Sequence, residues 1–111
     1  MDRLESYRQI IRTVLRRYVN IDYANVEVEN QAVFDSETDQ YIIASYGWGN
    51  KRRIHGCLIH VNIIEGKVWV QRDGTEDGIA NELVEAGIPK EEIVLGFHEP
   101  GVRKYTGFAV A

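Results

Sequence analysis

The sequence predicts an α+β fold with an N-terminal helix, a four-stranded antiparallel β-meander and C-terminal helical turns. Two observations lead to this prediction. Apolar residues recur at helical spacing before residue 20, alternate with polar residues from Val26, and return to helical spacing after Asp73. The connections between the alternating segments are short, which favours antiparallel pairing because parallel strands need long crossovers.

The first expected element is a helix with an apolar stripe and a basic row. Residues three or four positions apart form the stripe, as in an amphipathic helix: Leu4, Tyr7, Ile11, Val14, Leu15 and Tyr18. Arg8, Arg12 and Arg16 stand one above another outside this stripe, since residues four apart share a helix face. We expect the helix to end near Asn20, because Asn tolerates the left-handed conformation common at helix ends.

Four strands follow in the expected meander, over residues 26–34, 41–48, 51–64 and 67–72. The first alternates apolar with polar residues, and the second is rich in the aromatic and β-branched residues that favour strands. A polar turn over residues 35–39 joins these two strands. Gly49-Asn50 and Glu65-Gly66 are the expected hairpin loops, because Gly and Asn tolerate positive φ.

A second helix is expected after the sheet. The segment Asp73-Gly-Thr-Glu76 has the spacing of an N-cap with its reciprocal glutamate, and helical spacing continues from Ile79 to Ala86. Gly87 supplies a C-cap, and Pro89 prevents the helix from continuing. We expect one more helical turn over residues 90–93 and, in an otherwise irregular tail, a short strand over residues 105–110.

The length and composition indicate one ordinary globular unit. The chain has 111 residues, of which 44% are hydrophobic and 27% charged, so we expect a single domain over residues 1–111. A lone cysteine, Cys57, excludes an internal disulfide framework and a multi-cysteine zinc site. The chain is charged from Asp2 and has no long apolar run, so we expect neither a secretory signal nor a membrane span, and a cytoplasmic location.

Three histidines and one acidic cluster are the candidates for catalysis or metal binding. His55 and His60 are five positions apart, an odd offset that sends them to opposite faces of a strand unless a bulge at Gly56 intervenes. Asp73 and Glu76 are explained by helix capping. We therefore expect no metal, no cofactor and no catalytic residues. The alternative is a small hydrolase that uses His55, His60 and the Asp73/Glu76 cluster in one cleft.

Cys57 and the aromatic residues are expected to pack. A cysteine inside an apolar strand behaves as a small buried hydrophobe. The strand aromatics serve as core or interface, because the signature of RNA-recognition sheets is absent: Tyr41, Tyr46, Trp48 and Trp69. A single helix layer does not cover both faces of four strands, so we expect the uncovered face to support a twofold homodimer.

The charge of the chain is unevenly distributed. Residues 1–20 hold five arginines against Asp2 and Glu5, a net charge of +3, so the rest of the chain carries −7 of the total of −4. An acidic body disfavours broad wrapping of nucleic acid. Arg8, Arg12 and Arg16 are the candidate partner-binding residues, as a docking surface for an acidic partner or for phosphates. The alternatives are a solvated helix face and direct DNA binding through this helix.

Several segments together resemble one known family. In chain order the most specific are Gly66-Lys-Val-Trp69, Asp73-Gly-Thr-Glu76, Ala86-Gly-Ile-Pro89 and Ile93-Val-Leu-Gly-Phe97. The sequence LESYRQIIRTVLRRY near the start is similar to the opening helix of the same family. By the order and spacing of these segments, nearly the whole chain resembles the XisI family, the fdxN element excision controlling factors of cyanobacteria.

The resemblance implies a function that composition and spacing do not. It implies a non-catalytic accessory factor that works beside XisH and a site-specific recombinase when the fdxN element is excised. The XisH partner resembles nucleases in fold, so the resemblance also implies a protein that steadies, recruits or restrains such a partner. No catalytic residue is carried over to this chain from the family.

Overall fold

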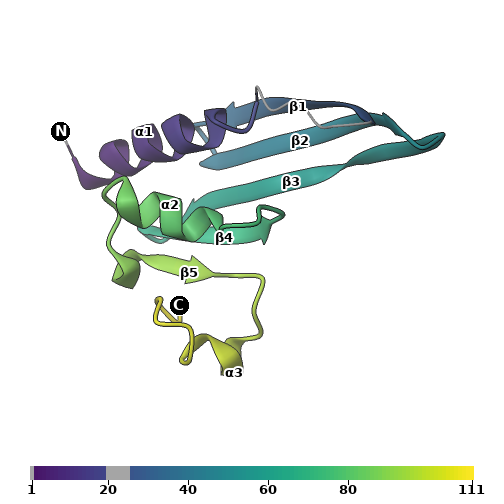
Figure 1. Cartoon of the computed structure of the whole chain (residues 1–111). Coiled ribbons are helices and arrows are strands. Elements are labelled where there is room, and N and C mark those ends of the chain that lie inside the picture. Colours follow the sequence, from purple (N-terminus) through teal and green to yellow (C-terminus); the bar gives the residue numbers. More distant parts are fainter. Residues whose placement is uncertain (1, 20–25) are drawn as a thin grey trace.

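The protein is represented by a computed structural model, which describes residues 2–19 and 26–111, and of Val26 the backbone (Figure 1). Within these described residues nine elements follow one another: α1 (Arg3–Arg16), β1 (Val26–Asp35), β2 (Gln40–Gly49), β3 (Arg52–Ile64), β4 (Lys67–Asp73), α2 (Ile79–Glu85), η1 (Lys90–Glu92), β5 (Ile93–Leu95) and α3 (Pro100–Arg103). The α+β class, the opening helix and the four-stranded meander are confirmed. No helix among the described residues is both long and apolar enough to cross a bilayer.

The sheet has one strand more than predicted. Its strand order is β1-β2-β3-β4-β5, and the first four strands are antiparallel neighbours. The fifth pairs with β4 in parallel, with Val68 opposite Ile93 and Val70 opposite Leu95. All three residues of β5 are buried. A buried strand of this length shows no alternation of apolar and polar residues, so the pattern used to predict the other strands does not detect it.

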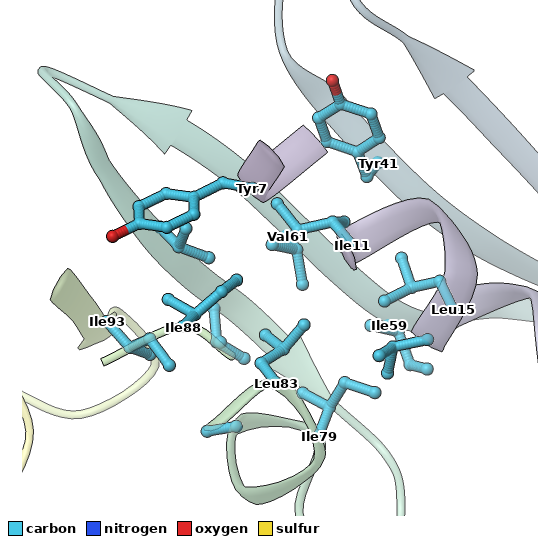
Figure 2. Packing of buried hydrophobic residues seen from close by; sticks show 14 of the residues in the cluster. Tyr7, Ile11, Leu15, Tyr41, Ile59, Val61, Ile79, Leu83, Ile88 and Ile93 are labelled. Atoms are coloured by element: carbon cyan, nitrogen blue, oxygen red, sulfur yellow. The ribbon is translucent and has the colours of Figure 1, made fainter. Parts of the chain in front are cut away.

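Both longer helices pack against one face of the sheet and form the core there (Figures 1 and 2). From α1 the stripe contributes Ile11 and Leu15, and from α2 the cluster receives Leu83, all fully buried. Tyr41 and Ile59 face them from β2 and β3. Burying one such aliphatic side chain stabilises the fold by roughly 1.5–3 kcal/mol, so this shared cluster is the main attachment of the helices to the sheet.

The first helix is well defined at both described ends. The Asp2 side chain accepts a hydrogen bond from the Glu5 backbone N–H at 2.8 Å, which satisfies one of the unpaired donors of the first turn. The helix ends at Arg16 and residues 17–19 form turns, so it stops earlier than expected. Asn20, the residue expected to end it, lies outside the described residues.

One hairpin loop is as predicted and the other is shifted by one residue. Glu65 and Gly66 have φ of 49° and 81° and form the β3–β4 loop as expected. The β2–β3 loop consists of Asn50 and Lys51, with φ of 50° and 63°, and not of Gly49 and Asn50. Gly49 is instead buried as the last residue of β2 and pairs with Arg52. A two-residue hairpin loop needs positive φ at both positions, and here Lys51 adopts it despite its side chain.

The start of α2 also differs from the prediction. The helix begins at Ile79, so Glu76 precedes its N-cap and forms no capping box. Asp73 nevertheless caps the helix from the end of β4, because its Oδ2 accepts from the Ile79 N–H at 2.9 Å. At the other end Gly87 is a C-cap as predicted: its N–H donates to Val84 O, and the next residue, Ile88, donates to Leu83 O.

The C-terminal segment is mostly irregular, as expected, and returns to the sheet once. The predicted strand over residues 105–110 is reduced to a single parallel bridge between Val94 and Ala109. The Ala109 N–H donates to Ile93 O at 2.9 Å. Gly107 and the turns over residues 104–108 keep the residues before Ala109 out of an extended run.

Candidate functional site

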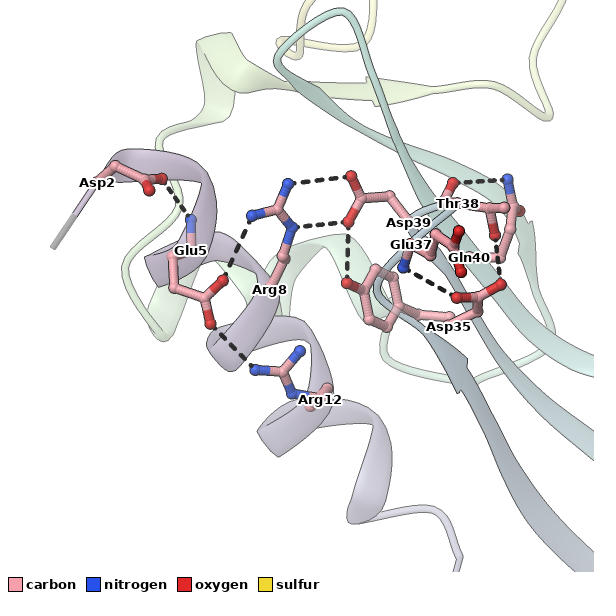
Figure 3. A network of polar contacts seen from close by, with 10 residues as sticks. Asp2, Glu5, Arg8, Arg12, Asp35, Glu37, Thr38, Asp39 and Gln40 are labelled. Atoms are coloured by element: carbon pink, nitrogen blue, oxygen red, sulfur yellow. Dashed lines mark hydrogen bonds and ion pairs between the residues drawn. The ribbon is translucent and has the colours of Figure 1, made fainter.

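The arginine row of α1 is joined to the sheet by a polar network (Figure 3). Arg8 donates to Asp39 in the β1–β2 turn through two nitrogens, Nε to Oδ1 at 2.8 Å and Nη2 to Oδ2 at 3.2 Å. The Tyr41 hydroxyl donates to the same Oδ1 at 3.0 Å. A guanidinium that holds a carboxylate in two-pronged geometry is the strong form of this contact. The hydrogen bond from Arg8 lowers the pKa of Asp39, and that from Tyr41 adds to this effect.

A single carboxylate lies between the first two arginines of the row. Glu5 contacts Arg8 Nη1 at 3.3 Å and Arg12 Nη2 at 3.6 Å. The side chains of Arg8 and Arg12 are only 23% and 24% exposed. The alternative of a solvated helix face is therefore wrong for these two residues. A charge three residues from Arg8 and seven from Arg12 in sequence offsets their repulsion.

Arg16 differs from the other two members of the row. It is exposed, and its guanidinium lies over the Phe34 ring at 5.2 Å from the ring centre. None of the ion pairs within residues 2–19 and 26–111 includes Arg16. Stacking on an aromatic ring leaves the edge of the guanidinium available to a carboxylate or phosphate. Of the three predicted binding residues, Arg16 is thus the most accessible to a partner.

The two strand histidines share a face after all, but they are far apart. The β2–β3 register shifts between Ile43 and Ala44, because β3 carries one extra residue at Leu58. His55 is therefore opposite Tyr46 and His60 opposite Ile42, two positions on the same face of β2. The bulge lies at Leu58 and not at Gly56, where the sequence suggested it. Four residues of strand separate the two histidines by about 13 Å, too far to share one ion.

The groups of the hydrolase alternative do not meet. Asp73 pairs with Ile59, whose side chain is buried on the helix-covered face, whereas His60 belongs to the opposite face. The Asp73 carboxylate is occupied by Thr75 and by the Ile79 N–H. No cluster of three metal-ligating side chains occurs among the described residues. Cys57 donates to Ile59 O at 3.2 Å, and burial raises the pKa of its thiol.

The face of the sheet opposite the helices has an ordered pattern across β1, β2 and β3. We call it the outer face, and its rows of paired residues are Glu27–Trp48–Arg53, Glu29–Tyr46–His55, Gln31–Ala44–Cys57 and Val33–Ile42–His60. Glu27 and Glu29 therefore stand on β1 and Arg53 on β3, at the same end of the face, and between them β2 carries Ile42, Ala44, Tyr46 and Trp48. The Tyr46 hydroxyl donates to Glu29 at 3.2 Å, and the Arg53 guanidinium lies 5.6 Å from the Trp48 ring centre.

A hollow of about 580 Å³ opens beside α2. Its lining is mostly acidic and polar: Tyr18, Asp77, Asn81, Glu82, Val84 and Glu85. The Tyr18 hydroxyl donates to Glu82, and burial together with this contact raises the pKa of Tyr18. Three carboxylates around one opening disfavour anionic ligands such as phosphate.

Comparison with known proteins identifies the family. The family model described as XisI protein matches residues 1–110. This chain belongs to the XisI family. The resemblance seen in the sequence is thereby confirmed, over almost all of the chain. Among curated proteins, none matches.

Two solved structures with the same fold carry names of the XisI family. A XisI-like protein from Anabaena variabilis ATCC 29413 is 38% identical, with a TM-score of 0.88 over 98% of this chain and 100% of that one. The fdxN element excision controlling factor XisI from Anabaena variabilis ATCC 29413 is 34% identical, with a TM-score of 0.84 over 99% of this chain and 100% of that one. Identity at this level over full length supports a common fold from α1 to the C-terminal segment.

Sequence reasoning missed two features of these surfaces. The Glu5 contact with Arg8 has a signal, because opposite charges three residues apart on a helix attract. The pattern of the outer face has a weaker signal in the sequence, because Glu27 and Glu29 alternate with the apolar residues of β1. Their alignment with Trp48 and Arg53 depends on the register of three strands, which a bulge changes.

Proposed function

We propose that this XisI-family protein is a controlling factor in the excision of a DNA element, and that it acts by binding and not by catalysis. The observation that carries the proposal is its full-length similarity to a protein named fdxN element excision controlling factor XisI. The separation of Asp73 from His60 by the sheet is consistent with a binding role, because a hydrolase needs these groups in one cleft. Since such a factor works on chromosomal DNA, the proposal includes a cytoplasmic location.

The proposed partner is a XisH-like protein with a nuclease-like fold, in an assembly that serves a site-specific recombinase. A protein that neither cuts nor joins DNA controls excision by changing where or when its partner acts. The net charge of −4 supports a protein partner over broad contact with DNA. The contact with DNA is then indirect, through the partner.

The arginine row of α1 is the proposed docking surface, with its members in different roles. Arg16 makes the direct contact, because it is exposed and belongs to none of the ion pairs among the described residues. Arg12 supports it from the same helix face, one turn away. Arg8 is held by Asp39, so its contribution is to fix α1 against the β1–β2 turn.

The test is a co-purification of this chain with a tagged XisH-like partner from the same genome. We expect Arg16→Gln to reduce the partner recovered, and Arg12→Gln with Arg16→Gln to reduce it further, while both variants melt close to the wild-type temperature. Lys104→Gln is the matched control, because it removes one exposed positive charge far from α1 in sequence. If the folded double variant recovers as much partner as the wild-type protein, the arginine row is not the docking surface.

A second measurement separates this function from direct DNA binding. DNA affinity that falls steeply with salt, and falls less steeply in Arg16→Gln, indicates phosphate contacts made by this chain itself. We expect no such dependence for the chain alone. A steep dependence would contradict the proposal that binding to DNA is indirect.

A further inference from the structure

The middle strand of the outer face, β2, carries Ile42, Ala44, Tyr46 and Trp48, and none of the four is buried. Trp48 is 55% exposed, and Val33, beside Ile42 on β1, is 53% exposed, although large apolar side chains are usually covered. The same face over β4 is covered, because the Arg103 guanidinium lies 5.1 Å from the Trp69 ring centre. Among the described residues, the outer face is therefore covered over β4 and exposed over β1, β2 and β3. Exposed apolar patches of this kind mark binding surfaces.

We propose that the outer face over β1–β3 binds the same face of a second copy of this chain, with the twofold axis parallel to β2. This inference goes beyond the proposed function and does not depend on the XisH-like partner. The occupant is a second copy because the charged end of the face complements itself. Glu27 and Glu29 lie on β1, Arg53 lies on β3, and the apolar and aromatic residues of β2 lie between them.

The direction of the axis follows from the strands on which the charges lie. A twofold axis along β2 places β1 of one copy over β3 of the other, and each row of one copy lies opposite the same row of the other copy. Glu27 then faces Arg53 of the second copy, and Trp48 faces Trp48. An axis across the strands would instead place β1 on β1, with Glu27 near Asp35 of the second copy. Opposite charges across an interface fix its register, whereas like charges oppose it, so the axis along β2 is favoured.

The size of the face sets the expected strength. Three strands about 4.8 Å apart and ten residues of about 3.3 Å each cover roughly 500 Å², or about 1,000 Å² for two copies. This area is near the lower limit for a specific protein interface. Two sheets can pack face to face with their strands within about 30° of each other, so the central rows remain in register. We therefore expect a reversible dimer that dissociates on dilution, and not a permanent one.

A charge exchange tests both the face and the identity of its occupant. Glu27→Arg and Arg53→Glu each place like charges opposite one another, whereas the double variant restores opposite charges, because both residues belong to every copy. The control is Glu37→Arg with Arg53→Glu, which restores the net charge but not the pairing, since Glu37 is exposed in the β1–β2 turn. Sedimentation equilibrium over a dilution series measures the dimer dissociation constant of each, and circular dichroism melts check that each folds.

The expected result is a raised dissociation constant in each single variant, by roughly tenfold, and its recovery in the double variant. The Glu37/Arg53 control should remain as weak as Arg53→Glu alone. Trp48→Glu should abolish the dimer. Dilution of the wild-type protein should shift its tryptophan emission, because Trp48 becomes exposed to solvent when the dimer dissociates. A wild-type monomer at all concentrations would overturn the proposal. So would a dimer that Trp48→Glu leaves intact, which would instead indicate pairing through the edge of β1.

Discussion

Gly47 provides the sharpest test of how closely β1 and β2 approach. Its φ is +152°, and a Cβ placed on it would lie 1.9 Å from the Glu27 carbonyl oxygen and 2.8 Å from the Val28 Cα. Non-bonded heavy atoms prefer separations of about 3.5 Å, so Gly47→Ala forces β1 away by roughly 1.5 Å. A shift of that size breaks the hydrogen bonds that flank the Val28–Gly47 pair.

The expected loss of stability can be worked out from these distances. Two broken cross-strand hydrogen bonds cost about 1 kcal/mol each. The strained backbone of a residue with a side chain adds about 1–3 kcal/mol. The free energy of unfolding should therefore fall by at least about 3 kcal/mol, and the melting temperature by about 12 °C at about 4 °C per kcal/mol. Thermal melts followed by circular dichroism measure the change.

Gly56→Ala is the matched control in the neighbouring strand. A Cβ on Gly56 meets no atom within 4 Å, and its φ is not positive. Alanine should therefore be tolerated there and stabilise the strand by about 0.5–1 kcal/mol, because glycine loses more backbone freedom on folding. If the two variants melt at the same temperature, a side chain at position 47 does not collide with β1, and the reasoning from this close approach is refuted.

Two further predictions concern titration. Asp39→Asn should lower the melting temperature at neutral pH, and the difference from the wild-type protein should close as pH falls. The folded-state pKa of Asp39 is depressed, so the stability that its carboxylate contributes is present above the usual carboxyl pKa of about 4. That stability is lost as pH falls through the lower pKa of the folded state. A difference in melting temperature that persists in acid would contradict the Arg8 contact. Burial, with the Asp39 contact, raises the pKa of Tyr41 to about 12. The stability contributed by the protonated hydroxyl is therefore complete below the usual tyrosine pKa of about 10 and is lost as pH rises through about 12. Tyr41→Phe should remove one late-titrating phenol from the ultraviolet absorbance titration, and an unchanged titration would show that Tyr41 ionises normally.

Local patterns were enough to predict most of the fold. The change of period at Val26 and again after Asp73 fixed the order of helix and strands, because each period reflects which side chains share a face. Gly87 ended its helix as predicted, because only a residue that tolerates positive φ completes that cap. These features depend on neighbours in sequence.

The features that were missed depend on residues distant in sequence. The strand Ile93–Leu95 exists because it pairs in parallel with Val68 and its neighbours across an intervening helix. Arg8 became a structural residue because Asp39, far along the chain, lies beside it. Asp73 caps Ile79 over a longer loop than the capping-box spacing assumes. Of the candidate site, the sequence therefore predicted which arginines share a helix face, but not which are available to a partner.

The bridge between Val94 and Ala109 has a consequence for how this sheet can grow. An edge strand with unpaired N–H and C=O groups is a template on which further strands add, and a sheet with two such edges can extend without limit. Here the chain's own tail occupies the β5 edge, because Ala109 donates to Ile93 and bridges to Val94. Strand-by-strand growth is thereby stopped on that side. Among the described residues β1 is the other edge of the sheet, and its pairing with β1 of a second copy yields a finite pair of molecules. We therefore expect the tail to hinder the addition of further strands at the β5 edge.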